Sequence, residues 1–367
     1  MSKNKKKITF FCPHISDGGL EKSLINYLNC FSINNEVSLV TNTFNKKQLK
    51  LINNRVKIIN FRINYLIKYR ILNNIICSFL LLKTLKKDTI IFSFQDHFFL
   101  LLYKYFGLKK KLVIRTSSAI PNNKNIYEAK YLNKKHFLKN FILKFYKYAN
   151  LVVASSEDNK RYFKKNLNVK NVEVIHNYFP KNYGNKKIKK IYNIFFIGRL
   201  VDDKDPIFFI RSLINLSNLN KFKIHIVGKG ECLSEMKKIS QSHFKDIKYH
   251  GYVQNPLIKL HKIIDLVCVT SKFDGTPNIL GEAMSYKIPC LAPTNVGKSN
   301  LLFKNGKFGY LYDPGNELSF KKQIVDIFNN YHLAIIKAQK GFNSLDRFDK
   351  ENTLLKLEKI FNKIKKY

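Results

Sequence analysis

Short apolar runs alternate along the chain with longer segments in which apolar residues recur every three or four positions. The short runs predict buried strands and the longer segments predict helices. In the first half, strands are expected at 8–12, 37–41, 56–61, 89–94, 111–115, 151–155 and 172–175. Helices are expected between them at 20–28, 71–85, 98–106 and from the end of 151–155 through Phe163.

The same alternation continues after a polar, basic, glycine-containing stretch at 181–190, which predicts a linker. Strands are expected at 191–197, 223–227, 247–251, 266–270 and 289–292, with helices at 205–216, 232–241, 256–264, 279–286, from 317 onward and at 351–365. Alternating strands and helices predict parallel βαβ units.

The predicted fold class is therefore α/β, with two Rossmann-like, doubly wound parallel-sheet domains facing a cleft. We expect an N-terminal domain at 1–180, the linker at 181–190 and a C-terminal domain at 191–345. The remaining segment, 346–367, is expected to be a C-terminal helix that can pack back on the N-terminal domain.

Composition supports two cores, because 45% of the 367 residues are hydrophobic. The formal net charge is +41, and only eight of the 66 basic residues are arginine. This charge favours anionic partners, whether nucleic acid, anionic lipid or a phosphorylated substrate. Proteins that grip phosphates or bases usually favour arginine, so the lysine excess is more typical of a compositional bias.

The six cysteines have no metal-ligand or redox-motif spacing, and most lie in apolar runs. They are expected to be buried thiols in a reducing, cytoplasmic compartment. The apolar run at 8–12 is too short for a signal-peptide core, and no uncharged apolar run reaches 18 residues.

Ligands of open α/β sheets bind beyond the carboxyl ends of the strands, so the residues there are the site candidates. Gly198, Arg199 and Lys204 follow one strand and precede a helix that begins near Pro206. Two cations beside a helix N-terminus suit a diphosphate, although a solvated turn is the commoner source of such a pattern.

Two weaker signals follow the next strands. Gly228 and Gly230 allow a close backbone approach to a ligand, although such a glycine pair occurs at least as often in an ordinary turn that binds nothing. Tyr252 and Val253 follow Gly251, where an aromatic side chain can edge a nucleobase or belong to the core.

The strongest signal is the segment from Asp274 to Glu282, where a strand leads through a glycine turn into a helix. The helix is expected to start near Asn278, and its N-terminus with the preceding amides can face an anion. Glu282 can accept hydrogen bonds from the two ribose hydroxyls of a nucleotide. A capped helix with an exposed glutamate is the structural alternative.

Taken in order, these motifs resemble the family-4 glycosyltransferases of GT-B fold. The resemblance is carried by Gly18-Gly19-Leu-Glu, Ile175-His-Asn, Gly198-Arg-Leu with Lys204, Gly228-x-Gly230, Gly251-Tyr-Val and Asp274-Gly-x-Pro-Asn-x-x-x-Glu282-Ala-Met. It spans residues 8 to about 315, and the last motif is the most specific.

The resemblance implies a role for each matching position. Arg199 and Lys204 would hold the donor diphosphate, Glu282 the ribose, and Asp274 the donor sugar. The backbone of Gly275, Thr276, Pro277 and Asn278 would cradle sugar and phosphate, and Gly18 and Gly19 would let the N-terminal loop approach the phosphate. The family also implies retention of anomeric configuration, a nucleotide-sugar co-substrate, and neither cofactor nor metal.

The chain departs from the family pattern in two places. Asp274 occupies a position that is usually glutamate, so its reach to the sugar is shorter. The segment Asn295–Asn300 lacks the acidic residue that usually follows a glycine pair there, which affects the donor-sugar pocket or has no effect.

The acceptor side gives fewer signals. Asp96 and His97 follow a strand of the first half and can hydrogen-bond the acceptor hydroxyl or the donor sugar. A histidine beside Phe98 and Phe99 is more often packed in a core. Arg115 ends the next strand and is another candidate for the acceptor wall, and His14 lies in the glycine loop.

The first 180 residues contain 33 basic and nine acidic residues, and lysines alternate with aromatic residues over 123–148. Such a helix can lie in a membrane interface, and it is equally typical of a surface helix that buries one aromatic face.

We therefore expect a retaining glycosyltransferase that moves a sugar from a nucleotide-sugar to a glycan or lipid-linked acceptor. The expected process is bacterial surface polysaccharide synthesis (lipopolysaccharide, O-antigen or capsule), with peripheral association at an anionic membrane surface. A nucleotide-sugar epimerase of the same architecture is the alternative, and a basic nucleic-acid-binding protein is a distant one. Neither the paired carboxylates of the former nor the arginine-rich patches of the latter are evident in the sequence.

Overall fold

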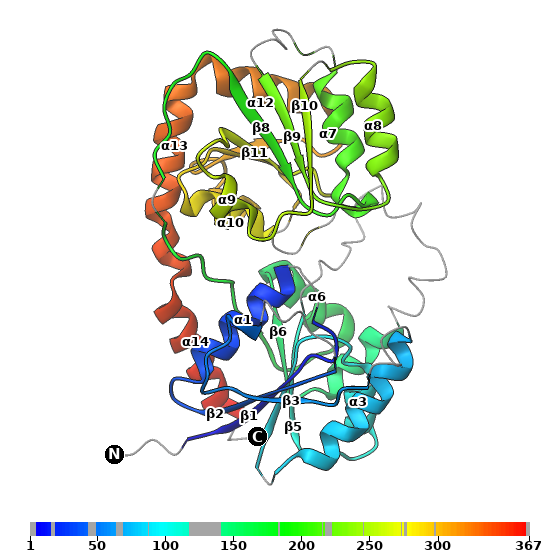
Figure 1. Ribbon diagram of the computed structural model, residues 1–367. Coiled ribbons are helices and arrows are strands. Elements are labelled where there is room, and N and C mark those ends of the chain that lie inside the picture. The colour runs from blue at the N-terminus through cyan, green and yellow to red at the C-terminus, as the bar shows by residue number, and fades with distance from the viewer. Residues whose placement is uncertain are drawn as a thin grey trace. The chain divides into compact units, whose positions relative to one another are not determined.

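The protein consists of two compact units, Met1–His176 with Glu351–Tyr367, and Asn177–Lys350. Each is a parallel sheet covered by helices, as the computed structural model in Figure 1 shows. The prediction of two parallel α/β domains is confirmed. The structure describes residues 5–15, 19–42, 49–63, 69–86, 88–116, 141–182, 184–214, 216, 222–244, 246–272, 274, 277–296 and 299–364.

Unit 1 is built on a seven-stranded parallel sheet of order β3-β2-β1-β4-β5-β6-β7. The strands are β1 (Lys7–Phe11), β2 (Glu36–Thr41), β3 (Lys57–Asn60), β4 (Ile90–Ser93), β5 (Lys111–Arg115), β6 (Leu151–Ala154) and β7 (Val172–Val174). The helices are α1 (Gly19–Phe31), α3 (Arg70–Thr84), α4 (Phe98–Tyr105), the short η3 (Phe145–Tyr148), α6 (Glu157–Leu167) and α14 (Lys350–Ile364).

Alternate residues of the unit 1 strands point to opposite faces of the sheet and form two cores. Phe10 packs with α1 and with Leu357, Ile360 and Ile364 of α14. Its neighbour Phe11 packs on the other face with residues of α3, α4 and α6. Both faces are covered, which explains why the strands are continuous apolar runs in the sequence.

Unit 2 is built on a six-stranded parallel sheet of order β10-β9-β8-β11-β12-β13. The strands are β8 (Tyr192–Ile197), β9 (Phe222–Val227), β10 (Ile247–Gly251), β11 (Leu266–Cys268), β12 (Cys290–Pro293) and β13 (Tyr310–Tyr312). The helices are η4 (Asp202–Lys204), α7 (Pro206–Leu213), α8 (Leu233–Gln241), α9 (Pro256–Leu260), α10 (Asn278–Ser285), α11 (Ser299–Phe303), α12 (Glu317–Asn329), α13 (Tyr331–Asn343) and η6 (Ser344–Phe348).

Several predicted elements of unit 2 have different limits in the structure. The helix expected at 205–216 ends at Leu213, because Ile214 adopts an extended conformation. The helix expected at 256–264 ends at Leu260, and the strand expected at 266–270 ends at Cys268. The short elements β13 and α11 were not predicted, because three to five residues are too few to show a period.

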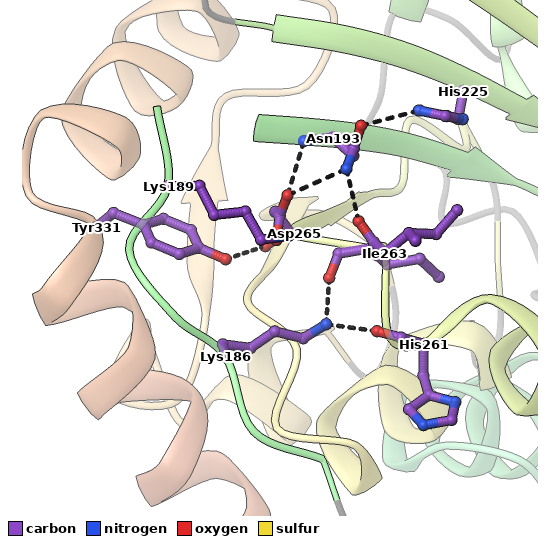
Figure 2. Close-up of polar contacts among 9 residues, drawn as sticks. Lys186, Lys189, Asn193, His225, His261, Ile263, Asp265 and Tyr331 are labelled. Atoms are coloured by element: carbon purple, nitrogen blue, oxygen red, sulfur yellow. Dashed lines mark hydrogen bonds and ion pairs between the residues drawn. The ribbon is translucent and has the colours of Figure 1, made fainter. Parts of the chain in front are cut away.

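The residues predicted as a linker, 181–190, lie in unit 2 and are bound to its sheet. Lys186 Nζ donates to the carbonyl oxygens of His261 and Ile264 (Figure 2). Burial lowers the pKa of Lys186 to about 8. Lys189 Nζ lies 2.7 Å from Oδ1 of Asp265, a side chain with no exposed surface. Two lysines therefore fasten this segment to unit 2.

Asp265 connects the linker to the amino-terminal ends of β8 and β11. Its Oδ2 accepts from the backbone N–H of Asn193 at 2.9 Å, and its carbonyl oxygen accepts from Tyr331 Oη at 2.9 Å (Figure 2). Because parallel strands bind ligands at their carboxyl ends, this buried ion pair serves the architecture of unit 2.

All six cysteines lie among the described residues, and each is a thiol rather than half of a disulfide. Five are buried, as predicted, and Cys232 is partly exposed. Burial raises the pKa of Cys77 to about 12. Within the described parts of the chain, every helix is too short or too polar to cross a membrane.

Candidate active site

The predicted donor-binding residues follow the carboxyl ends of β8, β9, β10 and β11. Since these strands are parallel and adjacent, their carboxyl ends lie along one edge of the unit 2 sheet. Gly198 and Arg199 follow β8, Gly228 and Gly230 follow β9, and Tyr252 follows β10.

Backbone hydrogen bonds join three of these strand-end loops. Gly198 N–H donates to the carbonyl of Val227 at 3.0 Å, and Leu200 N–H donates to that of Lys229 at 2.9 Å. Gly228 N–H donates to the carbonyl of Gly251 at 2.8 Å. The loops that start at residues 198, 228 and 251 therefore form one unit, which we call the strand-end frame.

Two glycines make this frame possible. Gly228 has a φ of +153°, and a Cβ there would lie 1.8 Å from the carbonyl oxygen of Gly198. A Cβ on Gly230 would lie 2.1 Å from the carbonyl oxygen of Leu200. The close approach that these glycines permit is thus to a neighbouring loop, and their contact with a donor stays a prediction.

Lys204 and Asp274 are brought together, although 69 residues separate them in the sequence. Lys204 Nζ forms an ion pair with the Asp274 carboxylate, and both side chains are mostly buried, with 21% and 15% exposed. The hydroxyl of Thr270 donates to the carbonyl oxygens of Lys204 at 3.0 Å and Asp205 at 2.9 Å. The loop after β11 is therefore tied to the loop after β8, and it presents a cation beside a carboxylate.

Arg199 is the more accessible predicted cation. Its side chain is 68% exposed, and its guanidinium lies 3.1 Å from the carboxylate of Asp203. Asp205 then starts α7 at a φ of +48°, and its side chain accepts from the N–H of Phe208 at 3.2 Å. Burial raises the pKa of Asp205.

Helix α10 carries the other predicted donor-binding residues. Pro277 precedes it, Asn278 is its first residue, and Glu282 lies about one turn further along, partly exposed. Gly275 and Thr276 lie outside the described residues. The α10 backbone amides and the Glu282 carboxylate thus share one helix whose N-terminus follows Asp274, as the sequence predicts.

The start of unit 2 holds α10 in place, a contact that the sequence interpretation missed. Asn177 Nδ2 donates to Asn278 Oδ1 at 2.6 Å. The Phe179 ring lies where a Cβ of Gly281 would be, with its atoms 2.4 to 2.5 Å from that position. Asn177 stood in a recognised motif, but nothing in the sequence indicated its partner.

The adjacent strands β9 and β10 carry a pair of histidines, close to the loops of the strand-end frame. His225 contacts His250 through Nδ1 at 2.9 Å and Asn193 Oδ1 through Nε2 at 3.0 Å. Figure 2 shows the second of these contacts. Burial lowers the pKa of His225 to about 4, so His225 is uncharged at neutral pH, and burial also lowers the pKa of His250. Tyr252, just beyond, is 45% exposed, and Val253 packs partly against the core.

In unit 1, the predicted site residues also follow strands, beginning with the donor-binding glycines after β1. Gly19 begins α1, whereas Gly18 lies outside the described residues. His14 is partly exposed, and its carbonyl accepts a hydrogen bond from the Cys12 thiol at 3.5 Å. The roles of these residues stay predictions.

His97 lies in a buried polar setting beside Asp96, which has a φ of +54°. His97 Nδ1 lies 2.7 Å from Ser93 Oγ, and its ring packs edge-on against Tyr146. Burial lowers the pKa of His97 to about 4. At neutral pH the imidazole is therefore uncharged and can exchange hydrogen bonds but not act as a cation.

Arg115 is buried, with 2% of its surface exposed. Its guanidinium lies over the Tyr27 ring, 4.7 Å from the centroid, and donates to the Tyr27 hydroxyl at 2.5 Å. Burial raises the pKa of Tyr27 to about 12, which keeps this hydroxyl protonated. Arg115 thus connects β5 to α1, and its predicted contact with an acceptor remains to be tested.

Among the described residues, no group of three or more histidine, cysteine or acidic side chains has the arrangement of a metal site.

Residues 179–342 match the model of the family described as "Glycosyl transferases group 1". These residues include Arg199, Lys204, Asp274 and Glu282. The matched region thus contains the strand-end frame and α10.

Two curated relatives are glycosyltransferases. The chain is 24% identical, over 91% of its length and 92% of the other, to "GalNAc-alpha-(1->4)-GalNAc-alpha-(1->3)-diNAcBac-PP-undecaprenol alpha-1,4-N-acetyl-D-galactosaminyltransferase" of Campylobacter jejuni. It is 27% identical, over 46% of each chain, to the "UDP-Gal:alpha-D-GlcNAc-diphosphoundecaprenol alpha-1,3-galactosyltransferase" of Escherichia coli.

Among solved structures, the chain is similar to a TarM variant of S. aureus in complex with Fondaparinux, alpha-GlcNAc-glycerol and UDP. The TM-score is 0.80 at 17% identity, over 97% of this chain and all of that one. This likeness shows a common fold.

Proposed function

We propose that this chain, a glycosyltransferase with a GT-B fold, transfers a sugar from a nucleoside diphosphate sugar to a lipid-linked saccharide, with retention of anomeric configuration. The observation that carries the proposal is the joining of Lys204, Asp274 and the α10 segment at the strand ends of unit 2. The region matched by the family includes all of them.

The chemistry follows from the charge that develops during transfer. The bond between the anomeric carbon and the diphosphate oxygen breaks, and the diphosphate leaves with added negative charge. The acceptor hydroxyl oxygen bonds to the sugar, and its proton passes to the departing diphosphate. Positioned cations and amides stabilise that charge, and removing one such group costs about 10²–10³-fold in rate. Lys204, Arg199 and the α10 N-terminus are the groups proposed for this task, without a metal ion.

Asp274 has two roles in this proposal. Its carboxylate holds Lys204 by an ion pair. When a donor binds, the diphosphate competes for the ammonium group, and the Asp274 oxygens can accept from sugar hydroxyls. Glu282, on the same helix as the amides, would accept from the ribose hydroxyls.

The proposed acceptor and process rest on the relatives. Both act on saccharides joined to undecaprenol through a diphosphate, according to their names. We propose a similar lipid-linked acceptor in bacterial surface polysaccharide synthesis, with family-4 membership and peripheral attachment at the inner membrane surface. The comparisons offer no support for an epimerase.

The test is a hydrolysis screen with UDP-, GDP-, ADP- and CMP-sugars, first without acceptor and then with a diphospho-lipid-linked saccharide. We expect release of one nucleotide, faster with acceptor, and unchanged after EDTA. Proton NMR of the first product should show the anomer of the donor. Failure to bind or turn over any nucleotide-sugar contradicts the transferase function, and an inverted product contradicts retention alone.

A further inference from the structure

Helix α3 of unit 1 exposes its apolar side chains and buries polar ones. Ile71 is 69% exposed and Phe79 is 49% exposed, on one side of the helix. The buried side includes Asn73, Asn74 and Ser78, none more than 7% exposed. A surface helix of a globular protein normally has the opposite arrangement.

Of the buried polar side chains, Asn73 is held by hydrogen bonds, whereas Asn74 Oδ1 and Ser78 Oγ have no hydrogen-bond partner in the described structure. Asn73 Oδ1 accepts from Asn42 Nδ2 at 2.7 Å and from the Cys77 thiol at 3.4 Å. Asn42 follows β2, and it also accepts from the N–H of Ile63 at 2.8 Å. Cys77 and Leu81 anchor the same side in the core. A rotation that buried Ile71 and Phe79 would break this network, so the apolar side stays outward.

The apolar side of α3 continues onto neighbouring elements. Helix α3 packs beside α4, which ends with Tyr105, 51% exposed, and is followed by Phe106, 74% exposed. The Tyr105 ring lies 4.9 Å from that of Tyr148, and Phe141 is 43% exposed. We call this set, from α3 through the end of α4 to 141–148, the α3–α4 surface. Figure 1 shows α3 on the side of the sheet opposite α1.

Lysines surround the α3–α4 surface. Lys83 Nζ lies 4.5 Å from the centre of the Phe79 ring, and Lys147 Nζ lies 5.2 Å from that of Tyr148. Lys110 Nζ donates to the carbonyl of Lys86 at 2.6 Å. Residues 69–116 contain nine basic and two acidic residues, and of the basic ones Arg115 is buried and Lys87 lies outside the described residues.

We propose that the α3–α4 surface docks the protein on an anionic lipid membrane. Aliphatic and aromatic side chains would enter the boundary between headgroups and acyl chains, while the lysines reach lipid phosphates. A second copy of this chain would place like charges against each other, so charge complementarity favours lipid over self-association. The proposal rests on the proposed lipid-linked acceptor, which a membrane-bound enzyme would meet at the bilayer surface.

This position differs from the one that the sequence predicted. The basic, aromatic stretch expected to meet the membrane was 123–148, of which 123–140 lies outside the described residues. Helix α3, the main part of the α3–α4 surface, is not in that stretch.

The chain contains no tryptophan, so a single introduced tryptophan reports on one position. We would prepare Phe79→Trp and Phe106→Trp, with Leu318→Trp as the matched control. Leu318 is 77% exposed and lies on α12 of unit 2. Each full-length variant is titrated with vesicles of phosphatidylglycerol and phosphatidylethanolamine, and separately with phosphatidylcholine alone.

With the anionic vesicles, the two unit 1 reporters should shift to shorter wavelength and be quenched by brominated lipid, whereas Leu318→Trp should not respond. Added salt should weaken binding, and phosphatidylcholine alone should bind at least tenfold more weakly. An equal response at Leu318, or none at Phe79 and Phe106, overturns the proposal. So does a shift without vesicles that grows with protein concentration, which indicates a second copy on this surface.

A double variant separates docking from catalysis. Ile71→Ser with Phe106→Ser should bind anionic vesicles at least tenfold more weakly than the parent, and Leu318→Ser should bind as the parent does. Hydrolysis of a water-soluble donor without acceptor should be the same in all three proteins. If the unmodified protein does not hydrolyse any donor, the proposed function is contradicted, and docking is then judged by the vesicle titrations alone. Unchanged vesicle binding in the double variant contradicts docking.

Discussion

The substitution Gly230→Ala tests whether the strand-end frame positions the predicted donor cations. The new Cβ would lie 2.1 Å from the carbonyl oxygen of Leu200 and 2.5 Å from its carbonyl carbon. Ordinary contact begins at 3.4 Å, so this backbone must move by about 1.3 Å. The movement strains two hydrogen bonds of Leu200, from its N–H to Lys229 and from Cys232 to its carbonyl.

Gly230→Ala is expected to lower both the stability of the protein and its kcat/KM, and the two effects can be measured separately. Overpacking typically destabilises by about 1–3 kcal/mol, which lowers the melting temperature by about 4–8 °C for a 2 kcal/mol loss in a unit of this size. Leu200 directly follows Arg199 and lies four residues before Lys204. A misplacement of about 1 Å can cost about 10²-fold in rate, so kcat/KM should fall by about that factor.

Nucleotide release measured against donor concentration gives kcat/KM, and thermal unfolding followed by circular dichroism gives stability. Gly107→Ala is the control, because Gly107 has a φ of +98° and no atom lies within 4 Å of the position that a Cβ would take there. It should lose about 1–2 kcal/mol of stability through backbone strain without any change in kcat/KM. If Gly230→Ala keeps its kcat/KM within twofold of the parent, the contact between these loops does not position the cations.

The remaining predictions concern individual side chains. Lys204→Gln should lower kcat/KM by about 10²–10³-fold and the free energy of unfolding by about 1–3 kcal/mol, since its ion pair with Asp274 is mostly buried. Arg199→Ala and Glu282→Ala should each lose at least about tenfold in kcat/KM and keep the fold, as donor kinetics and circular dichroism would show. Burial lowers the pKa of His97 from 6.5 to about 4. On acidification this imidazole therefore takes up a proton at a higher pH in the unfolded chain than in the folded protein, and the free energy of unfolding falls from pH 7 to pH 5. This histidine contributes about 2 kcal/mol to that loss, so urea unfolding of His97→Gln should show a correspondingly weaker pH dependence.

The three variants of the donor site have matched controls. Lys272 is as exposed as Lys204 and pairs with Asp202, and the exposed Arg211 pairs with Glu235. Lys272→Gln, Arg211→Ala and Glu235→Ala should retain kcat/KM within about twofold. Equal losses of kcat/KM in a variant and its control would show a general charge effect instead of a donor contact. If His97→Gln unfolds with the same pH dependence as the unmodified protein, protonation of His97 does not cause the loss of stability below pH 7.

Much of the fold was predictable, because strands buried on both faces leave apolar runs of a recognisable length. Phe10 and Phe11 illustrate this, since each belongs to a different core. The limits of elements were less predictable: Thr270 continues an apolar run but turns its hydroxyl toward the loop of Lys204. Such endings depend on partners far along the chain.

The candidate site was predictable as a set of loops and not as a set of contacts. Strand ends indicated where Lys204 and Asp274 lie, but the sequence does not show that their side chains form an ion pair. The contacts of Asn177 and Arg115 could not be predicted from the sequence either, for two different reasons. The partner of Asn177 is about a hundred residues away, and Arg115 ends a strand, as an acceptor-binding residue would, yet is buried against Tyr27.

The strand-end frame is held by main-chain hydrogen bonds, which persist through side-chain substitutions other than those to proline, provided that its two glycines remain. Side chains around it can therefore be exchanged during evolution without rebuilding the support beneath them. If the proposed donor site is right, a replacement at a loop position such as Asp274 would alter the sugar end of the site and leave this main-chain support in place.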